Sequence, residues 1–313
     1  MRFVMYAAES PQAGVIVGDQ VLPLAPGARL QDLLGDDGSL LRVAGEQAAT
    51  GAHGDPVPLE GLRLLAPIGD PPTLRDFYAF EQHVATARRN RGLDMDPDWY
   101  ELPVFYFSNP YAVVGPDDDV RAAPGSERLD YELEIAAVIG RGGANLTPAE
   151  AAAEGRIAGY TIMNDWSARD VQMREMRLSM GPVKGKDFAT SLGPWLVTLD
   201  EIEDAAKDRA FDLTMTATVN GREYSRASWS DIFWSFPEMI SYASRGSEVR
   251  PGDVIGSGTC GTGCILELSL THGSDAYPWL VEGDVVELSV DRLGSLRNVV
   301  TSALPLHPLR DPA

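Results

Sequence analysis

Three carboxylates alternate with apolar side chains between Leu129 and Ile135, in the sequence Leu-Asp-Tyr-Glu-Leu-Glu-Ile. On a β-strand, successive side chains point to opposite faces, so Asp130, Glu132 and Glu134 would line one face. Like charges at this spacing repel one another, and unpaired carboxylates are costly to bury. The pattern therefore indicates either a solvated strand face or a bound hard cation, and taken alone it favours the solvated face.

A second segment, residues 163–170, changes this balance. Its sequence is Met-Asn-Asp-Trp-Ser-Ala-Arg-Asp, which places Asp165 among apolar and small residues and directly before Trp166. A surface loop rarely carries tryptophan in such company. Asp165 is therefore a candidate fourth acid ligand. A site built only from carboxylate oxygens favours magnesium, calcium or manganese over zinc.

His83 is the candidate general base. It ends the segment 75–83, where an acid, a phenol and an imidazole lie within nine residues, and histidine titrates near neutral pH. A lone histidine on a helix is as often a satisfied polar residue. His53, His272 and His307 are predicted to be surface groups.

Two lysines lie in the glycine-framed segment 180–191, but the spacing of a phosphate-binding loop is absent. A lysine beside a metal-bound oxyanion is the functional interpretation, and a solvated turn is the alternative. Gly256–Gly261 matches the dinucleotide pattern G-x-G-x-x-G, which requires a following helix. Residues 265–270 alternate as a strand, so we reject nucleotide binding there. Glu267 on that strand would be either outward and solvated or inward and paired.

Composition excludes several classes of function. The 313 residues carry a net charge of -20, which argues against nucleic acids and anionic membranes as partners. The sequence shows neither a signal peptide nor an apolar run long enough to span a membrane, so a cytoplasmic protein is expected. Cys260 and Cys264 are predicted to be buried thiols, because four zinc-type ligands cannot be assembled around them.

The elements that must position these residues suggest two domains. Residues 1–66 predict a small β-rich N-terminal domain, with strands at 2–7, 13–17 and 20–24 and a helix over 30–47. A proline-rich boundary follows, and residues 67–313 predict a catalytic domain with a lid around 80–102. Further helices are predicted over 80–91, from the Thr147 cap and over 230–241. The fold class is α+β and mostly β, since no βαβ repeat is present.

Five segments together resemble the fumarylacetoacetate hydrolase family in order, spacing and residue type: 75–83, 129–135, 163–172, 185–190 and 259–268. The resemblance implies a mixed β-sandwich roll as the catalytic domain, a divalent cation and a homodimer. It also implies chemistry on 1,3-dicarbonyl or 2-keto acid substrates. The aromatic run 229–236 fits either a dimer interface or the core.

The resemblance assigns roles position by position. The cation, Mg²⁺ by preference and Ca²⁺ or Mn²⁺ otherwise, would be held by Asp76, Glu132, Glu134 and Asp165. His83 matches the catalytic histidine, Glu267 the acid that orients it, and Lys186 the lysine beside the substrate oxygens. Thr190 matches that lysine's neighbour, in a supporting or second-cation position. Substrate-contacting positions correspond to Tyr78, Arg91, Tyr106, Arg169, Gln172 and Thr259; aligning Arg91 requires a one-residue gap.

The implied reaction is metal-dependent hydrolysis of a carbon-carbon bond in a ketonic substrate, such as an acylpyruvate or a fumarylacetoacetate-like diketo acid. In it, His83 and Glu267 would activate the attacking water. Oxaloacetate decarboxylation and keto-enol isomerisation are alternatives within the same family. A non-catalytic protein that binds keto acids through its metal is the alternative from another class.

Overall fold

The computed structural model describes residues 1–310, and most of its regular structure is β-strand. One sheet contains twelve strands, with the order β4-β3-β2-β1-β15-β13-β11-β21-β6-β7; β5 pairs with β1 and β8 with β15. Most neighbours are antiparallel, but β21 runs parallel to β6 and β8 parallel to β15. The strands are β1 (Arg2–Ala7), β2 (Pro11–Val17), β3 (Gln20–Pro23), β4 (Val57–Pro58), β5 (Leu64–Leu65), β6 (Leu74–Phe77), β7 (Phe105–Ser108), β8 (Val113–Val114), β11 (Leu133–Ile139), β13 (Ile157–Asp165), β15 (Thr190–Val197) and β21 (Val254–Gly256).

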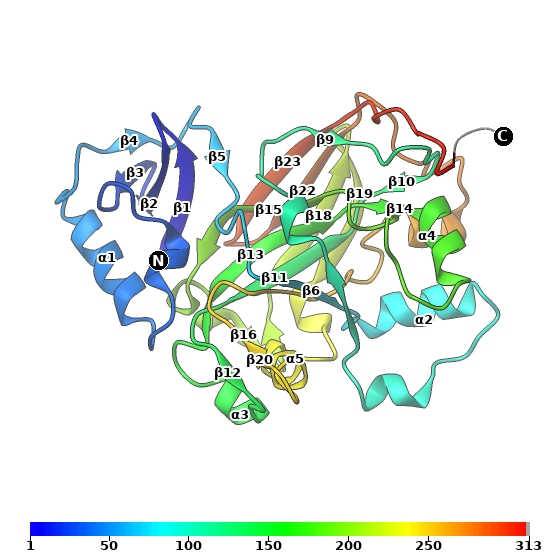
Figure 1. The fold of residues 1–313 in the computed structure, drawn as a ribbon, viewed down its shortest axis with the longest axis horizontal. Coiled ribbons are helices and arrows are strands. Elements are labelled where there is room, and N and C mark those ends of the chain that lie inside the picture. Colours follow the sequence, from blue (N-terminus) through cyan, green and yellow to red (C-terminus); the bar gives the residue numbers. More distant parts are fainter. Residues whose placement is uncertain (311–313) are drawn as a thin grey trace.

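A second sheet of five strands packs against strands β11, β13 and β15 of the first (Figure 1). Met215 of this sheet and Ile135 of β11 belong to the same hydrophobic cluster. Its strands, in spatial order, are β19 (Arg222–Ser228), β18 (Thr214–Val219), β22 (Val285–Val290), β23 (Gly294–Thr301) and β9 (Val120–Arg121).

Strand β11 is buried on both faces. Ile135 and Ala137 pack into the cluster between the sheets, while Ala136 and Val138 pack into a second cluster on the other side. A strand in this central position has no solvated face. The solvated-face interpretation of the acidic alternation is therefore wrong.

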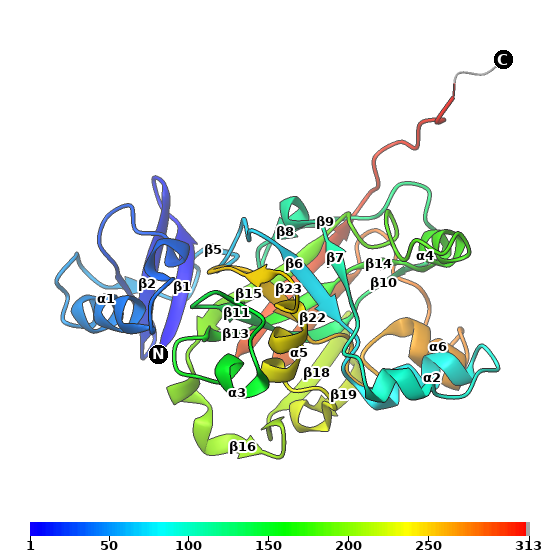
Figure 2. The ribbon, with the colours of Figure 1, turned by 60° about the horizontal axis from the view of Figure 1, so that its bottom comes forward.

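Helices lie at the edges of this β-rich body. Figure 2 shows α2 and α6 side by side at one end, α3 and α5 together, and α1 against the N-terminal strands. The helices are α1 (Ser39–Ala49), α2 (Glu81–Arg89), α3 (Pro148–Ala151), α4 (Arg169–Met176), α5 (Phe236–Ala243) and α6 (Ile265–His272). Short 3-10 turns cover Leu30–Leu33, Pro97–Tyr100, Pro110–Ala112, Leu199–Glu201, Glu203–Ala205 and Trp229–Asp231.

Three two-stranded pairs join β10 (Leu129–Asp130) to β14 (Ser167–Ala168), β12 (Gly143–Ala144) to β20 (Glu248–Val249), and β16 (Ala206–Lys207) to β17 (Ala210–Phe211).

The N-terminal strands and their hairpin are confirmed, but the helix predicted over 30–47 is divided. Gly35 and Gly38 have φ angles of 115° and 91°, which an α-helix does not accommodate. The Asp36 carboxylate then accepts hydrogen bonds from the amides of Gly38 and Leu40. The helix begins only at Ser39. The boundary between residues 66 and 67 stays a prediction, and β1 pairs directly with β15 of the later segment.

The strand predicted over 265–270 is wrong, because these residues form α6. The Asp130 carboxylate, far away in sequence, accepts hydrogen bonds from the first amides of the helix, those of Ile265 and Leu266. This tertiary cap satisfies donors that a local sequence pattern cannot account for.

Other local predictions hold in part. The helix over 80–91 is confirmed as α2, and the Thr147 capping box is present. The helix predicted over 230–241 is shorter, since Ser235 caps α5 with Glu238 in a capping box. Trp229 and Phe236 are buried in the hydrophobic cluster between the sheets, whereas Phe233 and Trp234 of this aromatic run are half-buried.

Both cysteines are buried free thiols, as predicted. Within residues 1–310, no helix combines the length and the apolar character needed to cross a bilayer. The α+β, mostly β class predicted from the sequence agrees with the observed elements.

Candidate metal centre and active site

Four buried carboxylates converge at the ends of neighbouring strands. Asp76 lies on β6, Glu134 on β11, Glu132 just before β11, and Asp165 at the end of β13. One oxygen from each residue lies within 4.8 Å of the others. The sheet order β13-β11-β21-β6 brings these strands together, although residues 76 and 165 are far apart in the chain.

Gly256 leaves room for this cluster. It lies on β21, between the strands that carry Asp76 and Glu134. A Cβ atom at this position would lie 2.5 Å from Asp76 Oδ1 and 2.6 Å from Met163 Cε, closer than real side chains approach. Any larger residue would therefore displace the Asp76 carboxylate.

Burial, together with repulsion between the acids, raises the pKa of two of the carboxylates so that they hold protons near neutral pH. Burial and the nearby Asp165 raise the pKa of Asp76 to about 8. Burial and Asp76 raise the pKa of Glu134 well above its usual value. Glu134 Oε2 and Asp165 Oδ1 are buried without a hydrogen-bond partner. Unpartnered carboxylate oxygens of this kind fit a hard divalent cation such as Mg²⁺, Mn²⁺ or Ca²⁺.

Two cationic side chains border the cluster. Lys186 Nζ donates to Glu132 and, at 2.7 Å, to Asp165 Oδ2. Arg169 Nη2 donates to Glu132 Oε1 at 2.8 Å. Burial raises the pKa of Glu132, but Arg169 and Lys186 outweigh this effect and hold it below its usual range. Glu132 is thus the carboxylate that stays charged most readily.

His83 and Glu267 form a buried pair beside these charges. His83 Nδ1 lies 2.9 Å from Glu267 Oε2, and this hydrogen bond links α2 to α6. Nε2 is therefore the ring nitrogen left for proton transfer. The ring of Tyr78 meets the imidazole edge-on at 5.7 Å between centroids. Of the two interpretations of Glu267, the inward, paired one is correct.

Asp130 does not join the four carboxylates, contrary to the prediction that it shares their face. The chain leaves regular strand geometry after β10, and β11 begins at Leu133. The Asp130 carboxylate instead accepts from Arg169 Nε at 2.7 Å and from the amides of Ile265 and Leu266 at 2.7 and 3.0 Å. It connects the arginine that contacts Glu132 with the helix that carries Glu267.

A cavity of about 400 Å³ opens onto this site. The predicted site residues that line it are Asp76, Tyr78, His83, Arg91, Tyr106, Glu132, Arg169, Gln172, Lys186 and Thr259. Arg91 is exposed at the rim, on the segment predicted to act as a lid. A larger cavity of about 690 Å³ borders the N-terminal segment, and its lining includes none of these residues.

Three of the predicted residues lie directly against acids of the cluster. The Tyr106 hydroxyl donates to Asp165, and Thr259 Oγ1 lies 3.4 Å from Glu134 Oε1. Thr190 pairs with Asp165 across β15 and β13, and its hydroxyl is buried without a partner.

Sequence reasoning missed two supporting roles. Asn164 Oδ1 accepts from the Glu132 amide at 2.9 Å and so helps to hold the backbone that carries this carboxylate. The position of Asn164 directly before Asp165, in the segment 163–170, could have indicated this role. The second role is that of Asp130. Its contacts with Arg169 and with the first amides of α6 join distant segments, and no local sequence pattern indicates them.

Comparisons with known proteins identify the family of this chain. The family model "Fumarylacetoacetate (FAA) hydrolase C-terminal" matches residues 73–301. A curated relative, oxaloacetate tautomerase YisK of Bacillus subtilis, is 32% identical over 216 residues, which cover 68% of this chain and 66% of that protein.

Solved structures show the same fold. Fumarylacetoacetate hydrolase from Exiguobacterium antarcticum superposes with a TM-score of 0.74 at 27% identity, over 96% of this chain and 99% of that one. Maleylpyruvate hydrolase from Sphingobium sp. SYK-6, in complex with manganese(II) and pyruvate, has a TM-score of 0.71. It is 23% identical, with coverage of 97% and 100%, and therefore shows likeness of fold alone.

Proposed function

Because the chain belongs to the fumarylacetoacetate hydrolase family, we propose that it is a metal-dependent hydrolase that cleaves a carbon-carbon bond in a 1,3-diketo acid. The observation that carries this proposal is the buried His83–Glu267 pair beside four convergent carboxylates at one cavity. A cation site alone would polarise a keto acid, whereas hydrolysis also needs a group that activates water.

Asp76, Glu132, Glu134 and Asp165 would hold the divalent cation, for which we favour Mg²⁺. The manganese(II) in the maleylpyruvate hydrolase structure supports a divalent ion in this fold. When bound, such an ion supplies Lewis-acid polarisation of the substrate oxygens. Lys186, within 2.7 Å of Asp165, supplies a second positive charge next to them.

Substrate binding falls to the polar residues that line the cavity. Arg169 and Gln172 are joined by a hydrogen bond of 3.1 Å and present donors to a carboxylate. Arg91 at the rim adds a further positive charge over the cavity. Tyr78 acts as a hydrogen-bond donor, and because burial raises its pKa to about 12, its hydroxyl keeps its proton even in alkaline solution.

His83 performs the proton transfers. Its Nε2 takes a proton from a water molecule while the water oxygen attacks the distal carbonyl carbon of the substrate. Glu267 holds Nδ1 in place and stabilises the imidazolium that forms. The carbon-carbon bond then breaks, its electron pair forms an enolate, and a proton returned to that carbon gives the methyl ketone. An acylpyruvate would yield two carboxylic acids.

A second candidate is keto-enol tautomerisation of oxaloacetate, favoured by the 32% identity with the tautomerase. Here His83 would move a proton between carbon and oxygen without attack by water. Oxaloacetate decarboxylation is the third reaction of this group. The homodimer and the cytoplasmic location implied earlier stay proposals alongside these activities.

The test follows enol absorbance for acylpyruvates, fumarylacetoacetate and oxaloacetate, first with Mg²⁺ and then with chelator. Metal-dependent cleavage of a diketone, with two acids as products, would support the hydrolase. Turnover of oxaloacetate alone would favour the second candidate. Metal-dependent thermal stabilisation without turnover of any substrate would contradict both and favour a keto-acid binding protein.

A further inference from the structure

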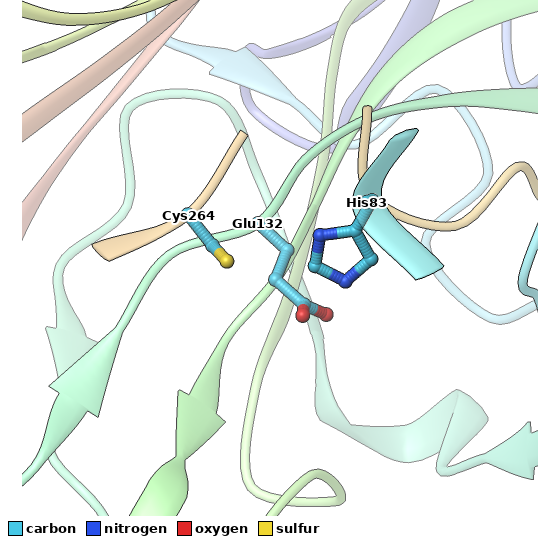
Figure 3. A group of neighbouring side chains, drawn as sticks. All are labelled: His83, Glu132 and Cys264. Atoms are coloured by element: carbon cyan, nitrogen blue, oxygen red, sulfur yellow. The ribbon is translucent and has the colours of Figure 1, made fainter. Parts of the chain in front are cut away.

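A second group of potential metal ligands lies beside the four carboxylates. One ring nitrogen of His83, one oxygen of Glu132 and the sulfur of Cys264 lie within 4.8 Å of one another, and all three residues are buried. Figure 3 shows these side chains converging from separate segments. His83 lies on α2, Glu132 precedes β11, and Cys264 is the N-cap residue of α6.

The donor chemistry of this group differs from that of the carboxylate cluster. Nitrogen and sulfur ligands select borderline and soft ions such as Zn²⁺ and Cd²⁺ over Mg²⁺. Three protein ligands with one open position are typical of zinc sites that are accessible to small molecules. The sequence analysis excluded a zinc site around the cysteines because four ligands could not be assembled there. The structure brings three potential ligands together, His83, Glu132 and Cys264.

The surroundings of His83 also fit a metal ligand. A histidine that binds a metal usually gives its other ring N–H to a carboxylate, which fixes the ring. Glu267 occupies that position, 2.9 Å from His83 Nδ1. Arg169 likewise fixes Glu132 at 2.8 Å. Two of the three potential ligands are therefore already oriented by neighbouring groups.

The negative charge of the buried acids is large enough to be balanced in part by a second cation. Arg169 and Lys186 are the positive side chains that contact the acids of the site. One divalent ion in the carboxylate cluster would leave the site negative when its acids are ionised. The six buried acids of the site are Asp76, Asp130, Glu132, Glu134, Asp165 and Glu267.

We propose that His83, Glu132 and Cys264 form a second, thiophilic metal site that binds Zn²⁺ or Cd²⁺ and thereby inhibits the enzyme. Binding replaces the proton of the Cys264 thiol, which is released to solvent, so that a sulfur-metal bond forms. The ion occupies the imidazole nitrogen that would otherwise accept a proton from water. The binding claim stands on the ligand geometry, and the inhibition claim rests on the proposed role of His83 as the base.

Two substitutions separate this site from its surroundings. Cys264→Ser removes the sulfur, while serine is a favourable N-cap residue that preserves the start of α6. Cys260→Ala is the matched control, because Cys260 is also a buried free thiol but is not a member of the ligand group.

The experiment titrates the full-length, Mg²⁺-saturated protein with Cd²⁺ and records the near-ultraviolet charge-transfer band of a thiolate-cadmium bond. Wild type and Cys260→Ala should show a band that saturates at one equivalent, with release of one proton. Cys264→Ser should lack the band, and its Zn²⁺ affinity by calorimetry should be ~10-fold weaker or more, as for loss of groups at metal sites.

Three outcomes would overturn the site: a band retained in Cys264→Ser, a band lost only in Cys260→Ala, or a band that appears only after Mg²⁺ is removed. In the activity arm, Zn²⁺ should inhibit wild type and Cys260→Ala at concentrations that spare Cys264→Ser; equal inhibition of all three would place the inhibitory ion elsewhere. A normal band in a protein that turns over no substrate would contradict the proposed hydrolase but leave the metal site standing.

Discussion

Replacing Asp76 with asparagine should stabilise the metal-free protein while it removes the cation site. Burial and the nearby Asp165 carboxylate raise the pKa of Asp76 to about 8. Asparagine has nearly the same shape, and its side-chain oxygen can still accept from the Gly258 amide, which lies 3.1 Å from Asp76 Oδ1. The substitution therefore removes the charge without opening a void.

The size of the effect follows from the pKa. An unfolded chain releases the Asp76 proton near its ordinary value of 3.8, whereas the folded, metal-free protein keeps it up to about pH 8. Between these values the folded state binds more protons, so its stability falls as pH rises. At ~1.4 kcal/mol per pH unit, the penalty is about 4 kcal/mol at pH 7 and about 1–2 kcal/mol at pH 5. Asparagine carries no such penalty.

The assay is urea unfolding in the presence of a chelator at pH 5 and pH 7. Asp76→Asn should exceed wild type in free energy of unfolding at both pH values, with the larger difference at pH 7. Asp55→Asn, at an exposed position of the N-terminal segment, should differ little from wild type. A variant that is less stable than wild type at pH 7, or a difference that does not grow with pH, would refute the electrostatic reasoning.

Four further outcomes are expected. His83→Gln should lower kcat by ~100-fold or more, the usual size of a general-base effect, while calorimetry shows nearly unchanged Mg²⁺ affinity; near-normal turnover would exclude it as the base. Asp165→Ala should abolish Mg²⁺ binding and activity together, and unchanged affinity by calorimetry would exclude it as a ligand. Asp130→Asn should lower the free energy of unfolding by about 1–3 kcal/mol, because one of the donors now paired with the carboxylate is left unsatisfied; an unchanged urea midpoint would contradict this. Mg²⁺ affinity should weaken as pH falls below 8, by ~10-fold or more per pH unit, because the cation must displace the protons that Asp76 and Glu134 hold; a flat pH profile in calorimetry would contradict it.

Several features were accessible from the sequence because they are local. The hairpin of the N-terminal strands depends on short-range turn chemistry, and α2 follows from its own residues. The acids at Glu132 and Glu134 stood out because their alternation with apolar residues left two interpretations, a solvated strand face or a bound cation. The resemblance to the family then added Asp76 and the pairing of His83 with Glu267, which no spacing in a single sequence could supply.

The tertiary structure decided what depends on contacts between distant residues. Whether the acidic strand was solvated or buried depended on the two clusters that pack on either face of β11. Residues 265–270 alternate like a strand, yet they form α6 because Asp130 caps its first amides across more than a hundred residues. The same long-range packing places Cys264 beside His83 and Glu132. Residue types and their local order therefore determined which chemistry was available, and packing determined which of these groups meet, because burial and hydrogen-bond partners come from segments far apart in the chain.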